Sequence, residues 1–457
     1  MGTVTEDQAK ELVDALARQL LAQARPSRLV CGISGGADST LALLVCLRAR
    51  ELKRDLEVLA VHCIHGLDAD DPIWLDHCKK LCSRVGVELE TPRLHIVYGN
   101  GRSPEEVSRA ERYSALLSRL HGGMLVLGHQ ADDMVESFLL ALKRGSGPNG
   151  LSGMSYITRD NRGTIIRPLL NLHKKEIESI IKALGFTFVY DISNSYLKFE
   201  RNFIRLKVLP LLRTRFAGID KAVLRSQKLC RYEHTLALER ASEILEQVRI
   251  PSQKRFRVLC GTQREELSCA KVAALDTASA YMTLWLYLEK YTTLPPECSV
   301  VEEVLRLCGA ASDQNGVVKL EDLEVRRQSD HLMVVDPLPE PPYPGVYSIA
   351  PGQSLELGAF VYRLVPSFDK RRAFAAEGDL RLDFTATGSV KLHPVWRDHS
   401  RELKKLYQEC SIVYWERAIY PLVRGSDQRI LALGGCFACR GSQEDQDLYE
   451  LSIIIKK

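Results

Sequence analysis

Residues 31–46 read CGISGGADSTLALLVC. The segment that leads into them, residues 28–33 (RLVCGI), is apolar and β-branched, which is typical of a buried strand. The segment that follows, residues 39–50 (STLALLVCLRAR), is rich in helix formers and has apolar side chains on more than one face. A strand, a glycine turn and a helix start leave backbone N–H groups pointing outward, so this stretch predicts an anion-binding turn.

The alternation of strand and helix continues to residue 190. Strand-like segments are expected at 28–33, 56–64, 87–96, 124–129 and 186–191, with helical stretches between them. Such repetition is typical of an α/β fold with a doubly wound parallel sheet. Ligands bind at the carboxyl ends of the strands in such sheets, so the residues after each strand are the candidate site.

The length of 457 residues is typical of two to four domains, and composition divides the chain into three. Residues 1–216 are predicted to form the α/β domain. Residues 217–336 are predicted to be mainly helical with a short strand-rich end, and 346–457 to form a mixed α+β module. The segment 337–345, PLPEPPYPG, has five prolines and is interpreted as a linker.

The overall composition restricts partners and location. The net charge of +4 is too small to indicate a nucleic-acid partner by itself, so local clusters must do so. No apolar run is long enough to span a membrane. The 13 cysteines are odd in number and lie mostly in apolar runs, which favours reduced thiols and a cytoplasmic protein. The oligomeric state is left open, and a homodimer is one option.

The turn after the first strand is the first candidate site. Its residues are Ser34, Gly35, Gly36, Ala37, Asp38 and Ser39. Glycines allow close approach to an anion, and the serine hydroxyls and the helix start add hydrogen-bond donors. No lysine follows the glycines, so this is not the GxxxxGK[ST] loop. A carboxylate in a phosphate-binding turn suggests that Mg²⁺ shares the site with Asp38. The alternative is a tight strand–helix turn capped by Asp38 or Ser39.

A second candidate site follows the expected strand at 124–129. Residues 127–147 read LGHQADDMVESFLLALKRGSG. On a helix, His129, Asp133 and Glu136 are three or four positions apart and share one face. Paired carboxylates there suit a substrate amine or Mg²⁺, although a helix dipole alone also favours carboxylates at that end.

Basic residues are concentrated in three further places. Arg109 and Arg112 would neutralise charge on a leaving phosphate. Residues 198–216 hold six Lys or Arg and one acid, which suits RNA phosphates. In the last module, cations are interleaved with Tyr407, Tyr414 and Trp415, which suits stacking on RNA bases. The alternative for the first two places is a helix with solvated cations, and for the last module it is core aromatics with a solvated basic face.

The hexapeptide SGGADS resembles the SGGxDS signature of the PP-loop ATP pyrophosphatases, which cleave ATP between the α and β phosphates. Other stretches are similar to one branch of that family, the tRNA(Ile)-lysidine synthetases. They are VHCIHGL at 61–67, SRAERY at 108–113, GHQADDMVES at 128–137, DISNSYLKFERNFIR at 191–205, and the LKK and WER stretches at 403–405 and 415–417. Ile64, Ser108 and Ser137 depart from the usual Asn, Ala and Thr. The resemblance covers nearly the whole chain and is weakest in the helical middle.

The resemblance implies an activity. ATP with Mg²⁺ would adenylate C2–O of the wobble cytidine in the CAU anticodon of tRNA(Ile), and L-lysine would then displace AMP to form lysidine. The loop residues 34–39, with His62 and Gly128, would bind ATP. Asp38, Arg109, Arg112, His129, Asp133 and Glu136 would be catalytic, with Asp133 and Glu136 binding lysine. The tRNA would be held by Arg201, Arg205, Lys207, Lys404, Lys405 and Arg417.

Two alternatives stay open. A tRNA 2-thiolase of the same family would need a sulfur relay or an iron–sulfur cluster, for which the cysteines, including Cys436 and Cys439, are not suitably spaced. An RNA-binding protein that uses ATP only as a conformational ligand would have no need for paired carboxylates beside a pyrophosphate loop. Release of pyrophosphate distinguishes this second alternative from an enzyme.

Overall fold

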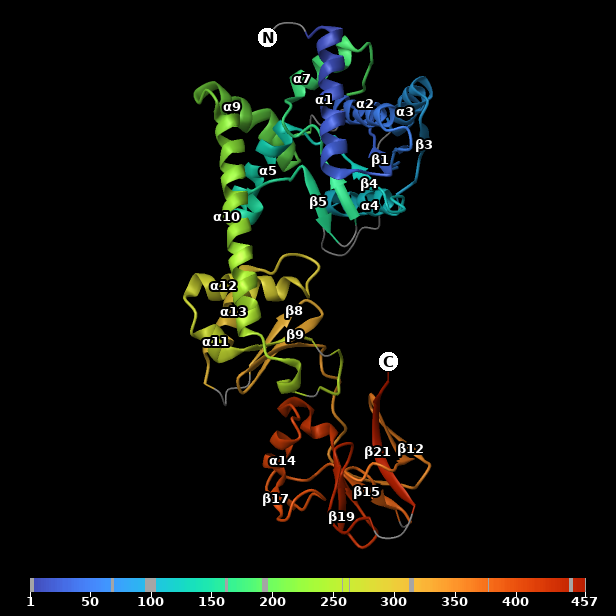
Figure 1. The fold of residues 1–457 in the computed structure, drawn as a ribbon, viewed down its shortest axis with the longest axis vertical. Coiled ribbons are helices and arrows are strands. Elements are labelled where there is room, and N and C mark those ends of the chain that lie inside the picture. The colour runs from blue at the N-terminus through green and yellow to red at the C-terminus, as the bar shows by residue number, and fades with distance from the viewer. Residues whose placement is uncertain are drawn as a thin grey trace. The chain divides into compact units, whose positions relative to one another are not determined.

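The computed structural model describes residues 4–66, 70–94, 104–160, 163–190, 196–256, 258–262, 264–311, 316–376, 378–443 and 447–456. The chain divides into two compact units, Met1–Thr235 and Leu236–Lys457 (Figure 1). The domain limits expected from the sequence, 216/217 and 336/346, remain predictions. Among the described helices, none is both long and apolar enough to cross a lipid bilayer.

The first unit is built around a six-stranded sheet with the order β3-β2-β1-β4-β6-β5. All neighbouring strands are parallel except β5, which runs antiparallel to β6. Its elements are α1 (Glu6–Ala24), β1 (Arg28–Gly32), α2 (Ala37–Leu52), β2 (Glu57–Val61), α3 (Asp71–Val85), β3 (Glu88–Glu90), α4 (Pro104–Leu117), β4 (Met124–Val126), α5 (Ala131–Lys143), α6 (Pro148–Leu151), β5 (Ile157–Asp160), β6 (Gly163–Ile166), α7 (Lys174–Ala183), α8 (Glu200–Phe203), a π-helical turn (Ile204–Val208), α9 (Leu209–Arg215) and α10 (Ile219–Val248), which continues into the second unit.

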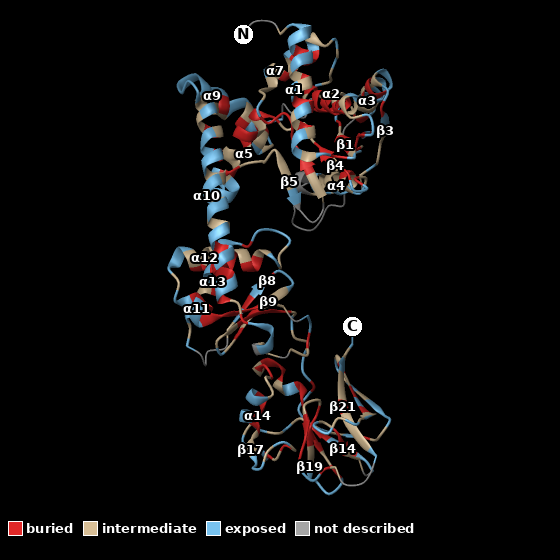
Figure 2. Cartoon of the chain, viewed as in Figure 1, coloured by how far each residue is buried: buried red, intermediate tan, exposed pale blue. Residues whose placement is uncertain are grey.

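Helices cover both faces of this sheet because side chains along each strand alternate between the faces. Leu29 and Cys31 of β1 pack in a large core with α1, α2, α3 and α7. Val30, between them, packs in a separate core with Leu116 of α4 and Leu125 of β4. The predicted doubly wound α/β sheet is therefore confirmed (Figure 2).

The prediction of a fifth strand at residues 186–191 was wrong. Residues 186–190 do not join the sheet, and the strand beside β4 is β6, residues 163–166, in a hairpin with β5. The Val189 N–H instead donates to the carbonyl of Gly35 at 3.0 Å. The apolar run 186–190 was read as a strand, but its backbone binds the loop after β1 and so forms a wall of the site.

The second unit has a helical part and several small antiparallel sheets. The first part contains a 3₁₀ turn (Ser252–Lys254), β7 (Glu266–Ser268), α11 (Cys269–Ala273), α12 (Thr277–Glu289), α13 (Cys298–Gly309), β8 (Val317–Leu320), β9 (Leu323–Gln328) and β10 (His331–Val335). These four strands form one sheet, in the order β7-β10-β9-β8, that shares a core with the helices. This matches the predicted helical region with a strand-rich end.

The remainder of the second unit is mainly strand. It contains β11 (Val346–Ile349), β12 (Ser354–Leu357), β13 (Phe360–Pro366), β14 (Phe374–Ala375), β15 (Leu380–Asp383), β16 (Lys391–Leu392), β17 (Arg401–Glu402), α14 (Leu403–Glu409), a 3₁₀ turn (Tyr414–Ile419), β18 (Leu422–Arg424), β19 (Ile430–Leu433), β20 (Phe437–Ala438) and β21 (Leu448–Ile455). Its two larger sheets have the orders β11-β15-β18-β19-β20 and β12-β13-β21-β14. Both contribute side chains to a single apolar core, consistent with the predicted α+β module.

Candidate functional site

A cavity of about 440 Å³ lies at the carboxyl ends of β1, β2 and β4 in the first unit. It brings together most of the residues that the sequence singled out. Its lining includes Ser34, Gly36, Ala37, Asp38, Ser39, His62, Arg112, Gly128, His129, Asp133, Arg201 and Arg205. The cavity therefore joins the glycine turn, Asp133 of α5 and part of the basic segment in one site, whereas the predicted Glu136 is not among its lining residues.

The glycine turn has the geometry of an anion cradle. Gly35 has φ +84°, a left-handed conformation that side chains rarely adopt, and an added Cβ would lie 2.9 Å from Val189 Cγ2. Gly36 is the N-cap of α2, and the Ser39 hydroxyl donates to its carbonyl at 3.0 Å. The Ser34 N–H donates to Ser39 Oγ at 3.1 Å, which closes the turn. The first N–H groups of a helix have no partner within it, so the N-terminus of α2 can bind phosphate oxygens.

Asp38 is the buried acid of this turn. Its Oδ1 is shielded from solvent and has no hydrogen-bond partner among the residues that the structure describes. Burial raises the pKa of Asp38 to about 7, and the negative charge of Asp133 adds to the shift, while Lys174 and Arg205 oppose it. A buried carboxylate oxygen without a partner is costly, which points to a cation or donor that binds there during function.

Gly128 allows β4 to end against this acid. A Cβ at position 128 would lie 2.6 Å from the carbonyl oxygen of Asp38 and 3.0 Å from the backbone nitrogen of Ser39. Backbone atoms cannot move aside as a flexible side chain can. The glycine in the GHQADD stretch is thus required by the close approach of β4 and α2.

Of the two α5 carboxylates, Asp133 lines the same cavity, whereas Glu136 is buried and is not among the lining residues. Asp133 Oδ2 accepts the Gln130 N–H at 3.1 Å, in a capping box at the start of the helix. Glu136 is completely buried, and Arg205 reaches it from the π-helical turn through two hydrogen bonds of 2.6 and 2.8 Å. Arg205 Nη2 also lies 3.5 Å from Asp133 Oδ1, and Arg201 Nε lies 3.9 Å from Glu136 Oε2. Burial raises the pKa of Glu136, but this two-point ion pair favours the ionised form.

Two histidines of the cavity are neutral because of their surroundings. Burial lowers the pKa of His129 to about 3, and the nearby charges of Arg167, Arg109, Arg112 and Arg201 act in the same direction. The Nδ1 atom of His129 is buried without a partner among the described residues. Burial also lowers the pKa of His62, whose Nδ1 donates to the Ile33 carbonyl at 3.0 Å.

The comparisons with known proteins agree with this geometry. A PP-loop domain model matches residues 7–212, and a model of the TilS substrate C-terminal domain matches residues 380–454. The tRNA(Ile)-lysidine synthase of Vibrio atlanticus strain LGP32 is 31% identical over 436 residues, which cover 93% of this chain and 95% of that protein. The enzyme of the same name from Yersinia pseudotuberculosis strain IP32953 is 33% identical over 457 residues and covers 95% of each chain.

This chain belongs to the tRNA(Ile)-lysidine synthase family. The match to the PP-loop domain also implies that it uses ATP.

Some of the arginines predicted to act in the site line the cavity, and one lies at the surface. Arg112 lines the cavity, whereas Arg109 is exposed, is not among the lining residues, and lies over the Tyr113 ring at 5.4 Å. Arg201 and Arg205 were predicted to contact tRNA. Both face Glu136 of α5, which would otherwise be a buried, unpaired charge, and their contact with tRNA stays a prediction.

The predicted tRNA-contacting residues of the second unit differ in how far they are exposed. Lys404 and Lys405 are exposed on α14, where both lie close to Glu402. Arg417 is half-buried over the Tyr407 ring, at 5.3 Å. Tyr407 and Trp415 are buried, each with 8% of its surface exposed, so the expectation that they stack on RNA bases was wrong.

Several site residues were missed in the sequence. Lys174, at the first position of α7, lines the cavity, and its positive charge lowers the pKa of Asp38. Gln130 caps α5, and Glu178 also lines the cavity. One signal was present, because Lys174 and Lys175 stand in the first turn of a helix, where the dipole disfavours cations. The expected Asp191, Ser193 and Asn194 lie outside the described residues.

Proposed function

We propose that this protein ligates L-lysine to C2 of the wobble cytidine in the CAU anticodon of tRNA(Ile), at the expense of ATP, and so forms lysidine. The observation that carries the proposal is the placement of a phosphate-binding turn and the Asp133 carboxylate around one cavity, with the buried Glu136 behind them, paired with the cavity residue Arg205. The turn suits the triphosphate, and the carboxylates suit the ε-ammonium of lysine. Relatives named tRNA(Ile)-lysidine synthase match more than nine-tenths of this chain, which supports the same activity.

The first step activates a poor electrophile. Cytidine O2 attacks the α-phosphorus of ATP, the bond from that phosphorus to the bridging oxygen breaks, and pyrophosphate leaves. The N-terminus of α2, with Ser34 and Ser39, holds the departing pyrophosphate by hydrogen bonds. Arg112, within the cavity, offsets the charge that develops on it, and Arg109 assists from the rim.

Mg²⁺ is proposed to bind at Asp38. The fit rests on the buried Asp38 Oδ1, which lacks a hydrogen-bond partner among the described residues and is the type of oxygen that Mg²⁺ prefers. When bound, Mg²⁺ supplies positive charge next to the phosphate oxygens. His62, His129 and Gly128 complete this side of the pocket, where neutral imidazoles leave the positive charge to the cation and the arginines.

The second step joins lysine to the base. The ε-amine attacks C2, and AMP leaves with the oxygen that it activated. The charge of Glu136 is already matched by Arg205, so Asp133 supplies most of the attraction for the lysine ammonium. A carboxylate at this position also accepts the proton that the ammonium must lose before it can attack.

The tRNA is proposed to bind through cations that point to solvent. Lys207, Lys404 and Lys405 are exposed and can reach phosphates, while Arg417 contributes from a half-buried position. Arg201 and Arg205 then act on the cavity side of the tRNA, near the wobble base. The base must be unstacked to react, so an anticodon loop is a suitable substrate.

The test is incorporation of labelled lysine into two transcripts, tRNA(Ile) with a CAU anticodon and tRNA(Met), with and without ATP. We expect ATP-dependent labelling of the first only. Pyrophosphate release without labelling would contradict the lysine step and direct attention to other nucleophiles. Asp38→Ala should abolish turnover without changing the circular dichroism spectrum, and normal turnover in this variant would overturn the assignment of Asp38.

A further inference from the structure

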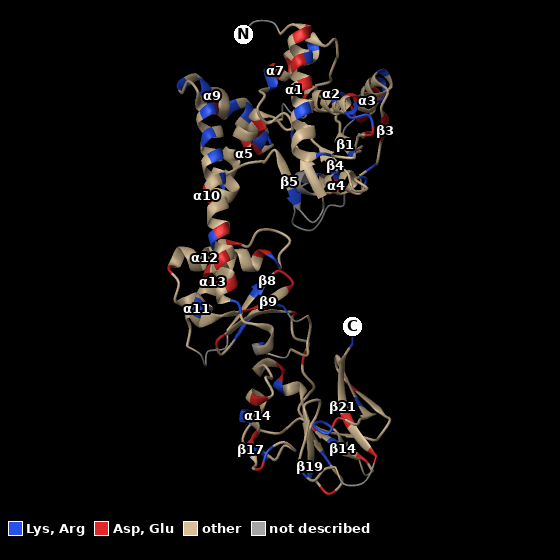
Figure 3. Cartoon of the chain, viewed as in Figure 1, with Lys and Arg blue, Asp and Glu red and all other residues tan. Residues whose placement is uncertain are grey.

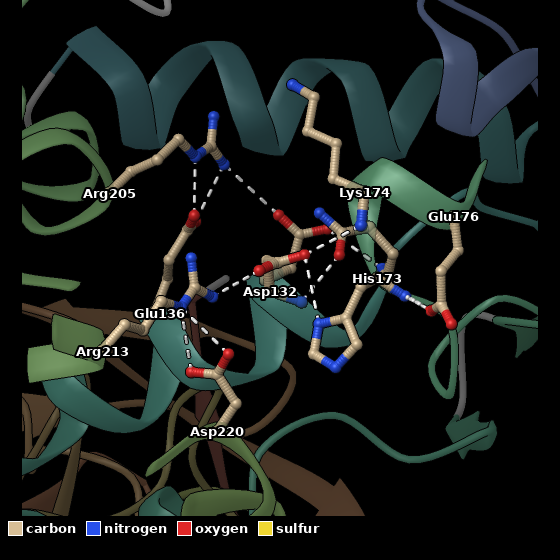
Figure 4. Close-up of polar contacts among 10 residues, drawn as sticks. Asp132, Glu136, His173, Lys174, Glu176, Arg205, Arg213 and Asp220 are labelled. Carbon is tan, nitrogen blue, oxygen red and sulfur yellow. Dashed lines mark hydrogen bonds and ion pairs between the residues drawn. The ribbon is translucent and has the colours of Figure 1, made fainter. Parts of the chain in front are cut away.

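Outside the cavity, three side chains form a group that resembles a metal site. The potential ligand atoms of Asp132, His173 and Asp220 all lie within 4.8 Å of one another. The position between the two carboxylates is already taken by a guanidinium (Figure 4). Arg213 Nη2 donates to Asp132 Oδ1 at 2.5 Å, and Arg213 Nε donates to Asp220 Oδ2 at 2.9 Å. Arg213 therefore supplies the positive charge that a metal ion would supply.

Asp132 connects this arginine to the catalytic cavity. Its second oxygen, Oδ2, accepts the Lys174 backbone N–H at 2.9 Å, at the first turn of α7. Its own N–H donates to Gln130 Oε1 at 2.6 Å, within the cap of α5. Lys174 and Asp133, the residues next to these contacts, both line the cavity. One carboxylate thus ties the ends of α5 and α7 together.

Asp132 is set up to remain charged. Burial would raise its pKa, but the Lys174 N–H and the Arg213 guanidinium outweigh burial and hold the pKa below its ordinary value. An ionised carboxylate makes stronger hydrogen bonds than a neutral one. Arg213 and Asp220 come from α9 and the start of α10, so the cluster joins four elements of the first unit.

The direction of Arg213 differs from that of its neighbours in the basic segment. Lys198, Lys207 and Arg215 are exposed and form no ion pair with a carboxylate among the described residues, whereas Arg213, with 37% of its side chain exposed, pairs with two carboxylates. Arg201, Arg205 and Arg213 all contact residues of α5. Two positions along a helix correspond to a rotation of about 200°, so Arg213 and Arg215 point to opposite sides of α9. Figure 3 shows Lys and Arg residues in blue on α9.

We infer that Arg213 is a positioning residue for adenylation, which holds Lys174 and Asp133 in place through Asp132. This inference rests on the proposed function. The geometry of the cavity depends on the N-termini of α5 and α7, and both are attached to the same carboxylate. Loss of the guanidinium leaves two carboxylates facing each other without a cation between them, and α7 can shift away from the cavity. A displacement of about 1 Å in a reacting site can reduce the rate by about 100-fold.

The experiment compares Arg213→Met and Arg213→Lys with wild type in tRNA-dependent pyrophosphate release and lysine incorporation. We expect Arg213→Met to lower kcat by about 10- to 100-fold, with the KM for tRNA within about threefold. Arg213→Lys should recover part of kcat, because it restores charge but cannot bond both carboxylates in a fixed fork. Arg18→Met is the matched control, since Arg18 is a surface arginine that pairs with Asp14.

A second variant separates positioning from folding. Asp132→Asn and Arg213→Met act through one contact, so the double variant should lose no more kcat than the more damaging single variant. Additive losses would overturn the inference. An Arg213→Met variant with normal kcat and weaker tRNA binding would also overturn the inference, because Arg213 would then contact a tRNA phosphate.

Metal binding is a further outcome. One Mn²⁺ or Zn²⁺ bound by the wild-type protein in equilibrium dialysis, and lost in Asp220→Asn, would overturn the role of Arg213 as the cation that pairs with Asp132 and Asp220. Failure of the proposed function is distinguishable, because it would appear as absence of lysine incorporation in wild type. The inference is judged on the ratio of variant to wild-type pyrophosphate release.

Discussion

Arg205 and Glu136 are 69 positions apart in the sequence and form a two-point ion pair, with Nε–Oε1 at 2.6 Å and Nη2–Oε2 at 2.8 Å. Glu136 has no exposed side-chain surface, and 24% of the Arg205 side chain is exposed. The pair joins α5 to the π-helical turn after α8. The basic segment therefore lines the candidate cavity through Arg201 and Arg205 and is also a candidate surface for RNA.

Removal of Arg205 should leave Glu136 as a buried charge without a hydrogen-bonded cation, since Arg201 Nε lies 3.9 Å away. We expect Arg205→Met to lower the free energy of unfolding by about 3–5 kcal/mol and to abolish lysine incorporation. Urea denaturation measures the first effect. Adding Glu136→Gln should recover much of the stability, because the unmatched charge is then gone, but not the activity.

The matched control is Lys10→Met, which breaks a solvent-exposed pair with Glu6. Such pairs contribute little, so no measurable change in stability is expected. Equal stability of Arg205→Met and wild type would contradict the assigned ion pair.

Gly128→Ala should disrupt the ATP-binding turn through its backbone. The added Cβ would lie 2.6 Å from the Asp38 carbonyl oxygen, so the first turn of α2 must move. We expect loss of ATP-dependent pyrophosphate release, measured with saturating tRNA, and weaker ATP binding by calorimetry. Gly309→Ala is the control, because nothing lies within 4 Å of a Cβ there. Wild-type ATP affinity in Gly128→Ala would show that the two backbones are not in contact.

The neutral state of His129 predicts a dependence of stability on pH. Its pKa is about 3 in the folded chain and about 6.5 in an unfolded one. Below pH 6.5 the unfolded chain takes up a proton that the folded chain excludes, so stability falls as pH falls toward 3. At pH 5 this uptake of a proton lowers the free energy of unfolding by about 2 kcal/mol.

Urea denaturation at pH 7.5 and pH 5.0 measures this contribution. The loss of stability between the two values should be about 2 kcal/mol smaller in His129→Asn than in wild type. The exposed His399 supplies the control, as His399→Gln should lose as much stability as wild type. An unchanged loss in His129→Asn would mean that His129 titrates normally in the folded protein.

The outward cations of the basic segment should determine the salt dependence of tRNA binding. Replacing Lys198, Lys207 and Arg215 by Met removes three exposed charges. If each contacts a phosphate, the slope of log K against log salt should fall by about 2, since each contact contributes roughly 0.7 on a single strand. Filter binding at several salt concentrations gives the slope. The triple variant Lys10→Met, Arg18→Met, Arg54→Met is the control for net charge, and an equal change in slope there would contradict a local contact.

Much of the fold could be predicted because its signals are local. SGGADS between an apolar strand and a helix specifies an anion-binding turn, and the alternating elements specify a parallel sheet. The prediction of a strand at 186–191 was wrong because an apolar run of strand length does not reveal whether its backbone bonds to a strand or to a loop. Here the Val189 N–H bonds to Gly35, and the hairpin of β5 and β6 takes the place in the sheet.

The sequence predicted the motif residues of the candidate site but not the ion pairs between distant segments. Asp38, Asp133 and Glu136 could be identified because each stands in a short motif after a strand. The contacts of Arg205 and Arg213 could not, because a cation in a basic segment has no local feature that distinguishes an RNA phosphate from a carboxylate 69 or 81 positions away. Local sequence determines backbone conformation and charge, whereas the direction of a long cationic side chain depends on which buried carboxylates the fold leaves to be neutralised.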